Sequence, residues 1–233
     1  MIPLKDDNPT NTFPFVTILL IVGNAAVFAY EMSLGHANIQ AFVRRMAVVP
    51  YEIGHGIAFQ EYPTLLTSLF LHGGFVHLLG NMLYLWIFGN NIEDALGHAR
   101  FILFYLICGI AASATHIALN TSSNVPVIGA SGAISGVLGA YLILYPRARV
   151  LVLVPIFFFI RIVRVPAFFV LGIWIVFQFI EGLPSLVADS ARAAGGVAWF
   201  AHIGGFFVGI LLLPLFKRPR RLTGHDDARQ FPE

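Results

Sequence analysis

Serine and histidine, which together can perform acyl transfer, both occur inside long apolar stretches of this 233-residue chain. Ser131 lies in the stretch VIGASGAISGVLGA, and His202 lies in AHIGG. A histidine within hydrogen-bonding reach can take the proton of a serine hydroxyl and make the oxygen a nucleophile. His77 and Asn81, one helical turn apart in HGGFVHLLGN, could donate hydrogen bonds to the negative charge that develops in such a reaction.

The composition indicates a protein whose solvent is a lipid bilayer. Apolar residues make up 58% of the chain and charged residues only 11%, and the mean hydropathy is +0.80. Soluble domains carry about 25% charged residues, so this chain lacks the polar surface that a water-soluble protein needs. Its one cysteine, Cys108, excludes a disulfide framework.

Apolar runs predict six membrane-spanning helices, because a spanning helix needs about 20 apolar residues and ~17 can suffice. We expect these helices at 14–32, 75–89, 101–119, 130–145, 166–180 and 197–216. The predicted fold is an all-α membrane protein whose six-helix bundle occupies residues 14–216. A short tail (1–13) precedes the bundle, and a basic, flexible tail (217–233) follows it.

The apolar stretch 150–160 is too short to span a membrane. Pro155 interrupts it, and Arg161 and Arg164 follow at once. A run of about 10–14 apolar residues is more often interfacial or re-entrant than spanning. We therefore expect this stretch to belong to the connection into the fifth helix.

The distribution of basic residues predicts how the six helices are oriented across the membrane. With six spans, both tails and the second and fourth loops share one side of the membrane, and they hold all but three of the 14 Lys and Arg residues. The exceptions are Arg44, Arg45 and Arg192. Because cytoplasmic loops are enriched in Lys and Arg, we expect both termini in the cytoplasm of a cell whose plasma membrane, of prokaryotic type, holds the protein.

With six spans in this orientation, the four residues that could take part in the reaction lie at a similar depth in the membrane. His77 and Asn81 fall in the first two turns of the second span, Ser131 at the head of the fourth, and His202 early in the sixth. At 1.5 Å per residue, all four lie within ~10 Å of one another in depth, below the outer surface. Polar side chains inside a span are costly and mark a functional site by default.

Small residues predict a close contact between the fourth and sixth spans. His202, Gly205 and Gly209 share one face of the sixth, and small residues recur at four-residue intervals in the fourth. Such patterns let two helix backbones approach closely in lipid. The approach would bring the imidazole of His202 within reach of Ser131.

Each of these residues also has an interpretation without chemistry. A serine beside glycines in a span often bonds back to its own helix, and we expect this of Ser135. A metal site formed by His72, His77 and His116 is an alternative, but no carboxylate or thiolate stands at ligand spacing and no HExxH motif occurs.

At these residues the chain resembles the rhomboid family of intramembrane serine proteases. The matching motifs are GASG at the head of the fourth span, AHIGG in the sixth and HGGFVHLLGN leading into the second. The resemblance covers residues 14–216 and is to the basic six-span form. It implies a catalytic dyad of Ser131 and His202, with His77, Asn81 and the Ser131 backbone N–H as the oxyanion hole.

Two features depart from the family pattern. The first loop lacks the Trp-Arg pair that many relatives carry. Ser135 stands where some relatives have a tyrosine that packs on the histidine. The sequence therefore does not name the group that orients His202.

The expected function is a serine endopeptidase that cleaves transmembrane helices of single-span proteins near the outer face. Its expected partners are those substrates and the lipid bilayer, with no cofactor, metal or nucleic acid. We expect the first loop (35–63) at the membrane interface, the fifth span as a lateral gate and the loop 183–197 as its cap. A catalytically idle helix-binding relative and a small transporter are the alternatives, although a transporter predicts an internal repeat that is not evident.

Overall fold

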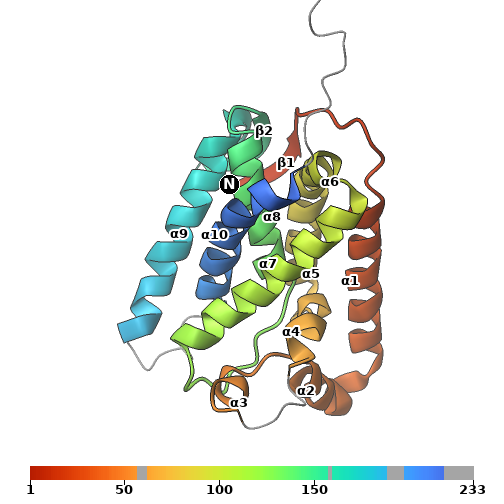
Figure 1. Ribbon diagram of the computed structural model, residues 1–233, viewed down its shortest axis with the longest axis vertical. Coiled ribbons are helices and arrows are strands. Elements are labelled where there is room, and N and C mark those ends of the chain that lie inside the picture. The colour runs from red at the N-terminus through yellow and green to blue at the C-terminus, as the bar shows by residue number, and fades with distance from the viewer. Residues whose placement is uncertain (57–61, 157–158, 188–196, 218–233) are drawn as a thin grey trace, which may run out of the picture.

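A computed structural model describes residues 1–56, 62–156, 159–187 and 197–217. Its helices form a bundle with a small sheet at one end (Figure 1). The helices are α1 (Phe15–Ser33), α2 (Gly35–Met46), α3 (Pro50–Gly54), α4 (Thr64–Thr67), α5 (Phe75–Tyr84), α6 (Asn90–Leu96), α7 (His98–Leu119), α8 (Ser131–Leu144), α9 (Ala167–Val187) and α10 (Trp199–Phe216). The strands are β1 (Ile2–Asp6), β2 (Arg149–Ile156) and β3 (Phe159–Pro166).

All six segments predicted to span the membrane are helical. In the described residues, α1, α7 and α10 are each long and apolar enough to cross a membrane. A fourth candidate is a bent pair, in which Thr64–Phe70 meets the continuous helix Phe75–Leu96 at 96°. The remaining two, α8 and Ala167–Leu183 of α9, are apolar but shorter. The chain is thus a mostly helical, multi-pass membrane protein, and the count of six crossings stays a prediction.

Helix α8 lies at the centre of the bundle, packed against α10 and α7. Its residues 132–141 are all buried. A helix that is apolar on every side must be covered on every side, so its neighbours hold its first residue, Ser131, in a fixed position.

Glycines bring α8 and α10 into backbone contact, as their spacing predicted. A Cβ atom added at Gly205 would overlap the carbonyl oxygen of Gly132, and one added at Gly209 would overlap that of Gly136. The two backbones approach too closely for any side chain at these positions. The small-residue pattern is therefore what allows the helix carrying His202 to lie against the helix carrying Ser131.

We expect Gly205→Ala to destabilise the protein by about 1–3 kcal/mol, because the added methyl group must push α10 away from α8. The matched control is Gly172→Ala in α9, where an added Cβ has no neighbour within 4 Å. Alanine favours a helix over glycine by roughly 0.5–1 kcal/mol, so the control should be neutral or stabilising. Denaturation of both variants in detergent measures the difference, and equal stability would contradict the close contact.

Glu93 fastens the start of α1 to α6. Its carboxylate accepts hydrogen bonds from the backbone N–H groups of Val16 (2.8 Å) and Thr17 (2.7 Å), and from the Thr17 hydroxyl at 2.7 Å. The first N–H groups of a helix have no partner within the helix, and a carboxylate there also complements the helix dipole. Glu93 therefore has a structural role far from Ser131 along the bundle.

The prediction of an all-α fold is wrong in one respect, since β1, β2 and β3 form an antiparallel sheet in that order. The predicted N-terminal tail contains β1, and the stretch 150–160 contributes to a β-hairpin, with Val152 opposite Val163. Valine and isoleucine dominate both hairpin strands, and β-branched side chains suit a pleated strand. As predicted, the stretch belongs to the connection that leads into α9.

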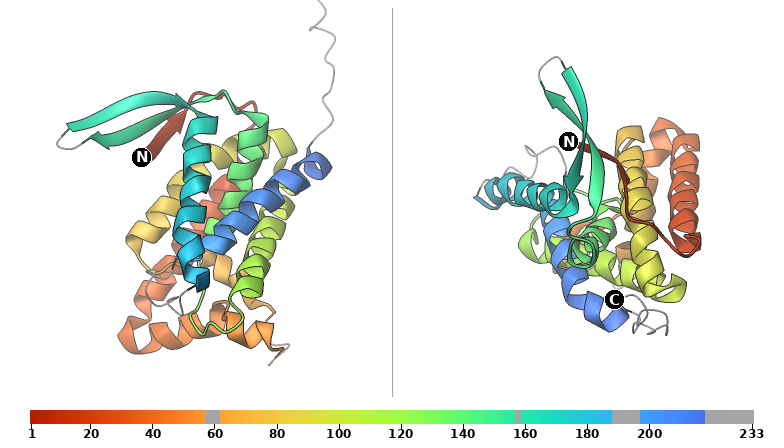
Figure 2. Two further views of the ribbon diagram at one scale, coloured as in Figure 1. Left: turned by 90° about the vertical axis from the view of Figure 1, so that its left-hand side faces the viewer. Right: turned by 90° about the horizontal axis from the view of Figure 1, so that it is seen from above.

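The sheet and the end of α10 lie at the same end of the bundle (Figure 2). There the Arg100 guanidinium donates a hydrogen bond to the Phe216 carbonyl. At the opposite end, α2 and α3 of the first loop lie near the start of α4 (Figure 1). Residues 218–233 of the predicted flexible tail, and 188–196 of the predicted cap, lie outside the described residues.

Candidate active site

Ser131 is the first residue of α8 and follows a tight turn of the chain. Gly129 in that turn has φ +120°, which L side chains rarely adopt. The Gly129 backbone N–H donates to the Ser68 carbonyl at 2.9 Å. As a first-turn residue, Ser131 has a backbone N–H without a partner inside its helix, so the turn presents both its hydroxyl and its N–H.

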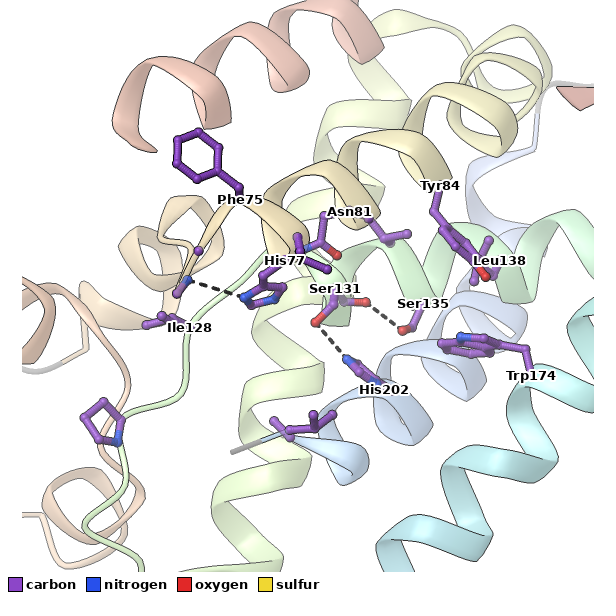
Figure 3. A pocket seen from close by; sticks show the side chains of 18 of the residues that line it. Phe75, His77, Asn81, Tyr84, Ile128, Ser131, Ser135, Leu138, Trp174 and His202 are labelled. Atoms are coloured by element: carbon purple, nitrogen blue, oxygen red, sulfur yellow. Dashed lines mark hydrogen bonds between the residues drawn. The ribbon is translucent and has the colours of Figure 1, made fainter. Parts of the chain in front are cut away.

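The structure brings His202 to Ser131 (Figure 3). The His202 Nε2 atom lies 2.8 Å from the Ser131 Oγ atom, within hydrogen-bonding distance. His202 sits in the first turn of α10, the helix that the glycine contact holds against α8. A hydroxyl that donates to an unprotonated imidazole nitrogen is the arrangement that general-base activation requires.

Gln178 of α9 orients His202, a role that the sequence did not reveal. The His202 Nδ1–H donates to the Gln178 Oε1 atom at 2.7 Å, and the Gln178 Nε2 in turn donates to the Trp174 carbonyl at 3.1 Å. Because an amide oxygen can only accept, the proton resides on Nδ1 and leaves Nε2 free to accept from Ser131. The Trp174 ring lies beside the imidazole, at a centroid distance of 5.9 Å. Gln178 and Trp174, both from α9, thus contact the imidazole of His202. In some members of the family that the sequence resembles, a tyrosine at the position of Ser135 packs on this histidine.

His77 approaches the turn before Ser131. Its Nδ1 atom accepts a hydrogen bond from the Gly73 backbone N–H at 3.4 Å, so the other ring nitrogen carries the proton. This other nitrogen is Nε2, and a Cβ atom added at Gly129 would lie only 2.8 Å from it. Glycine at 129 therefore makes room for an N–H donor next to Ser131.

His72 holds Asn81 in place. The Asn81 side-chain amide donates to His72 Nε2 at 3.1 Å, and His72 Nδ1 lies 3.3 Å from the Phe70 carbonyl that it donates to. The His72 backbone N–H donates to the Glu31 carboxylate at 3.2 Å. An amide nitrogen has two N–H groups, so Asn81 keeps a second donor for the cavity that it lines. From the sequence, His72 was assigned only to the alternative metal site, so its contact with Asn81 was not predicted.

All four predicted site residues line one cavity of about 850 Å³. It is bounded by one side of α5 along its length, by the segments before α8 and α10, and by residues of α8, α9 and α10. The residues with polar side chains in its lining are His77, Asn81, Tyr84, Ser131, Ser135, Trp174 and His202.

Ser135 and the histidines of the metal alternative take other roles. The fully buried Ser135 donates its hydroxyl to the Ser131 carbonyl at 2.6 Å, the packing bond that was predicted. His116 is not among the residues that line the cavity. Within the described part of the chain, no three His, Cys, Asp or Glu residues are grouped so that they could hold a metal ion.

Comparison with known proteins identifies the family. The family model of the Rhomboid domain matches residues 60–219, which include every residue of this site. The chain belongs to the rhomboid family.

Several rhomboid relatives are 33–37% identical to this chain over the segments that align with it. Rhomboid protease GluP of Bacillus subtilis is 37% identical over 138 residues, which are 59% of this chain and 25% of that protein. The mitochondrial Rhomboid protein 1 of Saccharomyces cerevisiae is 33% identical over 155 residues, 64% of this chain and 40% of that protein. The putative rhomboid protease YdcA of Bacillus subtilis is 34% identical over 134 residues, 56% of this chain and 62% of that protein. The chain thus spans less than two thirds of the length of each of these relatives.

Proposed function

We propose that this rhomboid family member is an intramembrane serine endopeptidase with a catalytic dyad of Ser131 and His202. The observation that carries the proposal is the 2.8 Å contact between His202 Nε2 and Ser131 Oγ, with the His202 tautomer set by Gln178. A packing serine has no need of an oriented base. The relatives named as proteases support the same activity.

In the proposed reaction, Ser131 Oγ attacks the carbonyl carbon of a peptide bond while His202 Nε2 takes the hydroxyl proton. The carbonyl oxygen becomes negatively charged and accepts hydrogen bonds from His77, Asn81 and the Ser131 backbone N–H. Each well-placed donor of this kind typically contributes about 3 kcal/mol. The charged His202 then protonates the leaving amine as the C–N bond breaks, which leaves an acyl-enzyme.

Water completes the cycle. His202 takes a proton from a water molecule whose oxygen attacks the acyl carbon, and the proton then returns to Ser131 Oγ as the acid product leaves. This step requires water at membrane depth, and the cavity that Ser131 lines gives it a place next to the base. Gln178 accepts from Nδ1–H throughout and acts as a positioning residue, because it touches the base and not the substrate.

The substrates proposed are single-span membrane proteins, cut near the outer face. We propose six crossings with both termini in the cytoplasm of a prokaryotic cell, which places the start of α8 on the outer side. Helix α9 is the proposed lateral gate. Supporting this, it packs mainly on α10, with smaller contacts to α8 and to the strands β2 and β3, and it exposes large apolar side chains such as Phe169 and Val176.

Cleavage of a generic single-span substrate by the purified protein, in detergent and in vesicles, tests the proposed function. We expect two products whose masses place the cut at one peptide bond near the end of the substrate helix. An intact substrate that remains bound to the protein would instead support the idle, helix-binding alternative.

A further inference from the structure

The hairpin of β2 and β3 extends sideways beyond the helices, from the end of the bundle where the sheet lies (Figure 2). At its base, Val150 and Val152 are fully buried in the main core. Along the edge strand β3, residues 159–164 are all exposed, including Val163, which lies opposite Val152. Apart from its pairing with β2, this part of β3 is therefore not covered by another element of the described chain.

Large apolar side chains lie on both faces of this exposed segment of β3. Successive side chains of a strand point to opposite faces, so Phe159 shares a face with the buried valines whereas Ile160 and Ile162 lie on the other. Phe159 is 74% exposed, Ile160 69% and Ile162 58%. An antiparallel sheet in water presents a polar face to the solvent, whereas here large apolar side chains are exposed on both faces, each of which also carries one arginine. We therefore expect at least part of the exposed surface of β3 to contact an apolar environment in addition to water.

The only charges on the hairpin are positive. Arg161 and Arg164 lie on β3 and Arg149 begins β2, while no acidic residue occurs between Arg147 and Ile180. Basic residues next to a spanning helix are attracted to anionic lipid headgroups. The charge thus complements a phospholipid surface.

The base of the hairpin lies at the ends of two predicted spanning helices, where the headgroups of the membrane are expected. It connects the end of α8 to the start of α9, and the Ala167 backbone N–H that begins α9 donates to the Ala148 carbonyl at 2.8 Å. In the described residues β3 pairs only with β2, so its outer edge has unpaired backbone groups that hydrocarbon would not tolerate. The boundary between headgroups and acyl chains accommodates these groups, the apolar side chains and the arginines together.

We propose that the strands β2 and β3 are an anchor in the membrane interface that binds anionic phospholipid headgroups and fixes the base of α9. Its apolar side chains enter the acyl boundary, and Arg161 and Arg164 reach the phosphates. This interaction is independent of the proposed protease activity, and an inactive protein would retain it.

Spin labels on single introduced cysteines test the location of the hairpin. The native Cys108 is fully buried, and the unmodified protein measures its background labelling. Label at Phe159→Cys and Ile160→Cys should collide with oxygen more than with a neutral nickel chelate in vesicles. The lipid reference is Leu211→Cys, whose side chain is 73% exposed on α10, and the water reference is Pro9→Cys in the exposed N-terminal segment. Hairpin labels that match the Pro9 reference would overturn the proposal.

The headgroup preference is tested by comparing vesicles of phosphatidylcholine alone with vesicles that also contain phosphatidylglycerol. Anionic lipid should move the Ile160 label toward the lipid reference, and Arg161→Gln with Arg164→Gln should abolish that shift. The matched control, Arg44→Gln with Arg45→Gln, changes two exposed arginines at the other end of the bundle and should leave the shift intact. Spin–spin broadening that disappears on dilution with unlabelled protein would overturn the proposal in favour of a second copy paired along β3.

Discussion

Ser131→Ala is expected to abolish peptide-bond cleavage, while Ser135→Ala leaves it within about threefold of the unmodified protein. Removing a serine nucleophile from a hydrolase lowers kcat by at least about 10⁴-fold, which corresponds to about 5.5 kcal/mol of transition-state stabilisation. Ser135 is the matched control because it lies one turn along the same helix and its hydroxyl is held by the Ser131 carbonyl. Both serines line the same cavity, so the pair separates reaction from packing.

His202→Ala should lower the rate as strongly as Ser131→Ala, and the double variant should be no worse than either single one, because residues that act as a unit are not additive. The rates come from product formation with a single-span substrate under saturating conditions. Folding of each variant is checked by its unfolding transition in the same detergent. Cleavage by folded Ser131→Ala at the unmodified rate would refute the proposed dyad.

Gln178→Leu is expected to lower kcat by about 10- to 100-fold with little change in KM. Leucine cannot accept the hydrogen bond from His202 Nδ1–H that the structure shows at 2.7 Å, so the imidazole loses both its fixed tautomer and its orientation. In a serine protease triad, the loss of the correct histidine tautomer alone costs about 10⁴-fold. The smaller expected effect reflects the Trp174 ring, which still lies beside the imidazole.

Two variants distinguish positioning from packing at this site. Gln178→Glu keeps an acceptor oxygen at the same distance and should recover most of the activity. Phe177→Leu alters the neighbouring residue of α9, whose side chain is 54% exposed, and should leave kcat unchanged. Equal loss in the leucine and glutamate variants at position 178, with both folded, would show that Gln178 does not act through the His202 hydrogen bond.

The grouping of the four candidate residues was predictable because a membrane restricts where polar groups can lie. Counting spans placed Ser131, His202, His77 and Asn81 at one depth, and the glycine spacing predicted which helices touch. The structure places all four around one cavity. Gln178 was missed because it is a single amide in the bulky run WIVFQFI, although a lone polar residue inside a span is itself a signal of function. The contact of His72 with Asn81 depends on the bend before α5, which no sequence pattern specified.

The sheet was missed for a different reason. The length of 150–160, its Pro155 and the arginines that follow were used only to exclude it as a span, whereas the valine and isoleucine content of β2 and β3 favours strands. The pairing of β1 with β2 joins segments about 150 residues apart, with Ile2 opposite Leu153, and local pattern carries no information about such a partner. Tyr141 strengthens this contact by donating its hydroxyl to the Asp6 carboxylate at 2.6 Å.

Covalent labelling with a mechanism-based serine probe, followed by mass mapping of the modified peptide, tests the central claim most directly. A probe that mimics an acyl donor reacts only with a serine that a neighbouring base activates. We predict one adduct, on Ser131, which is lost in His202→Ala and retained in Ser135→Ala. A folded protein that takes up no probe, or one that carries the adduct on Ser135, would contradict the proposal that Ser131 and His202 form a catalytic dyad.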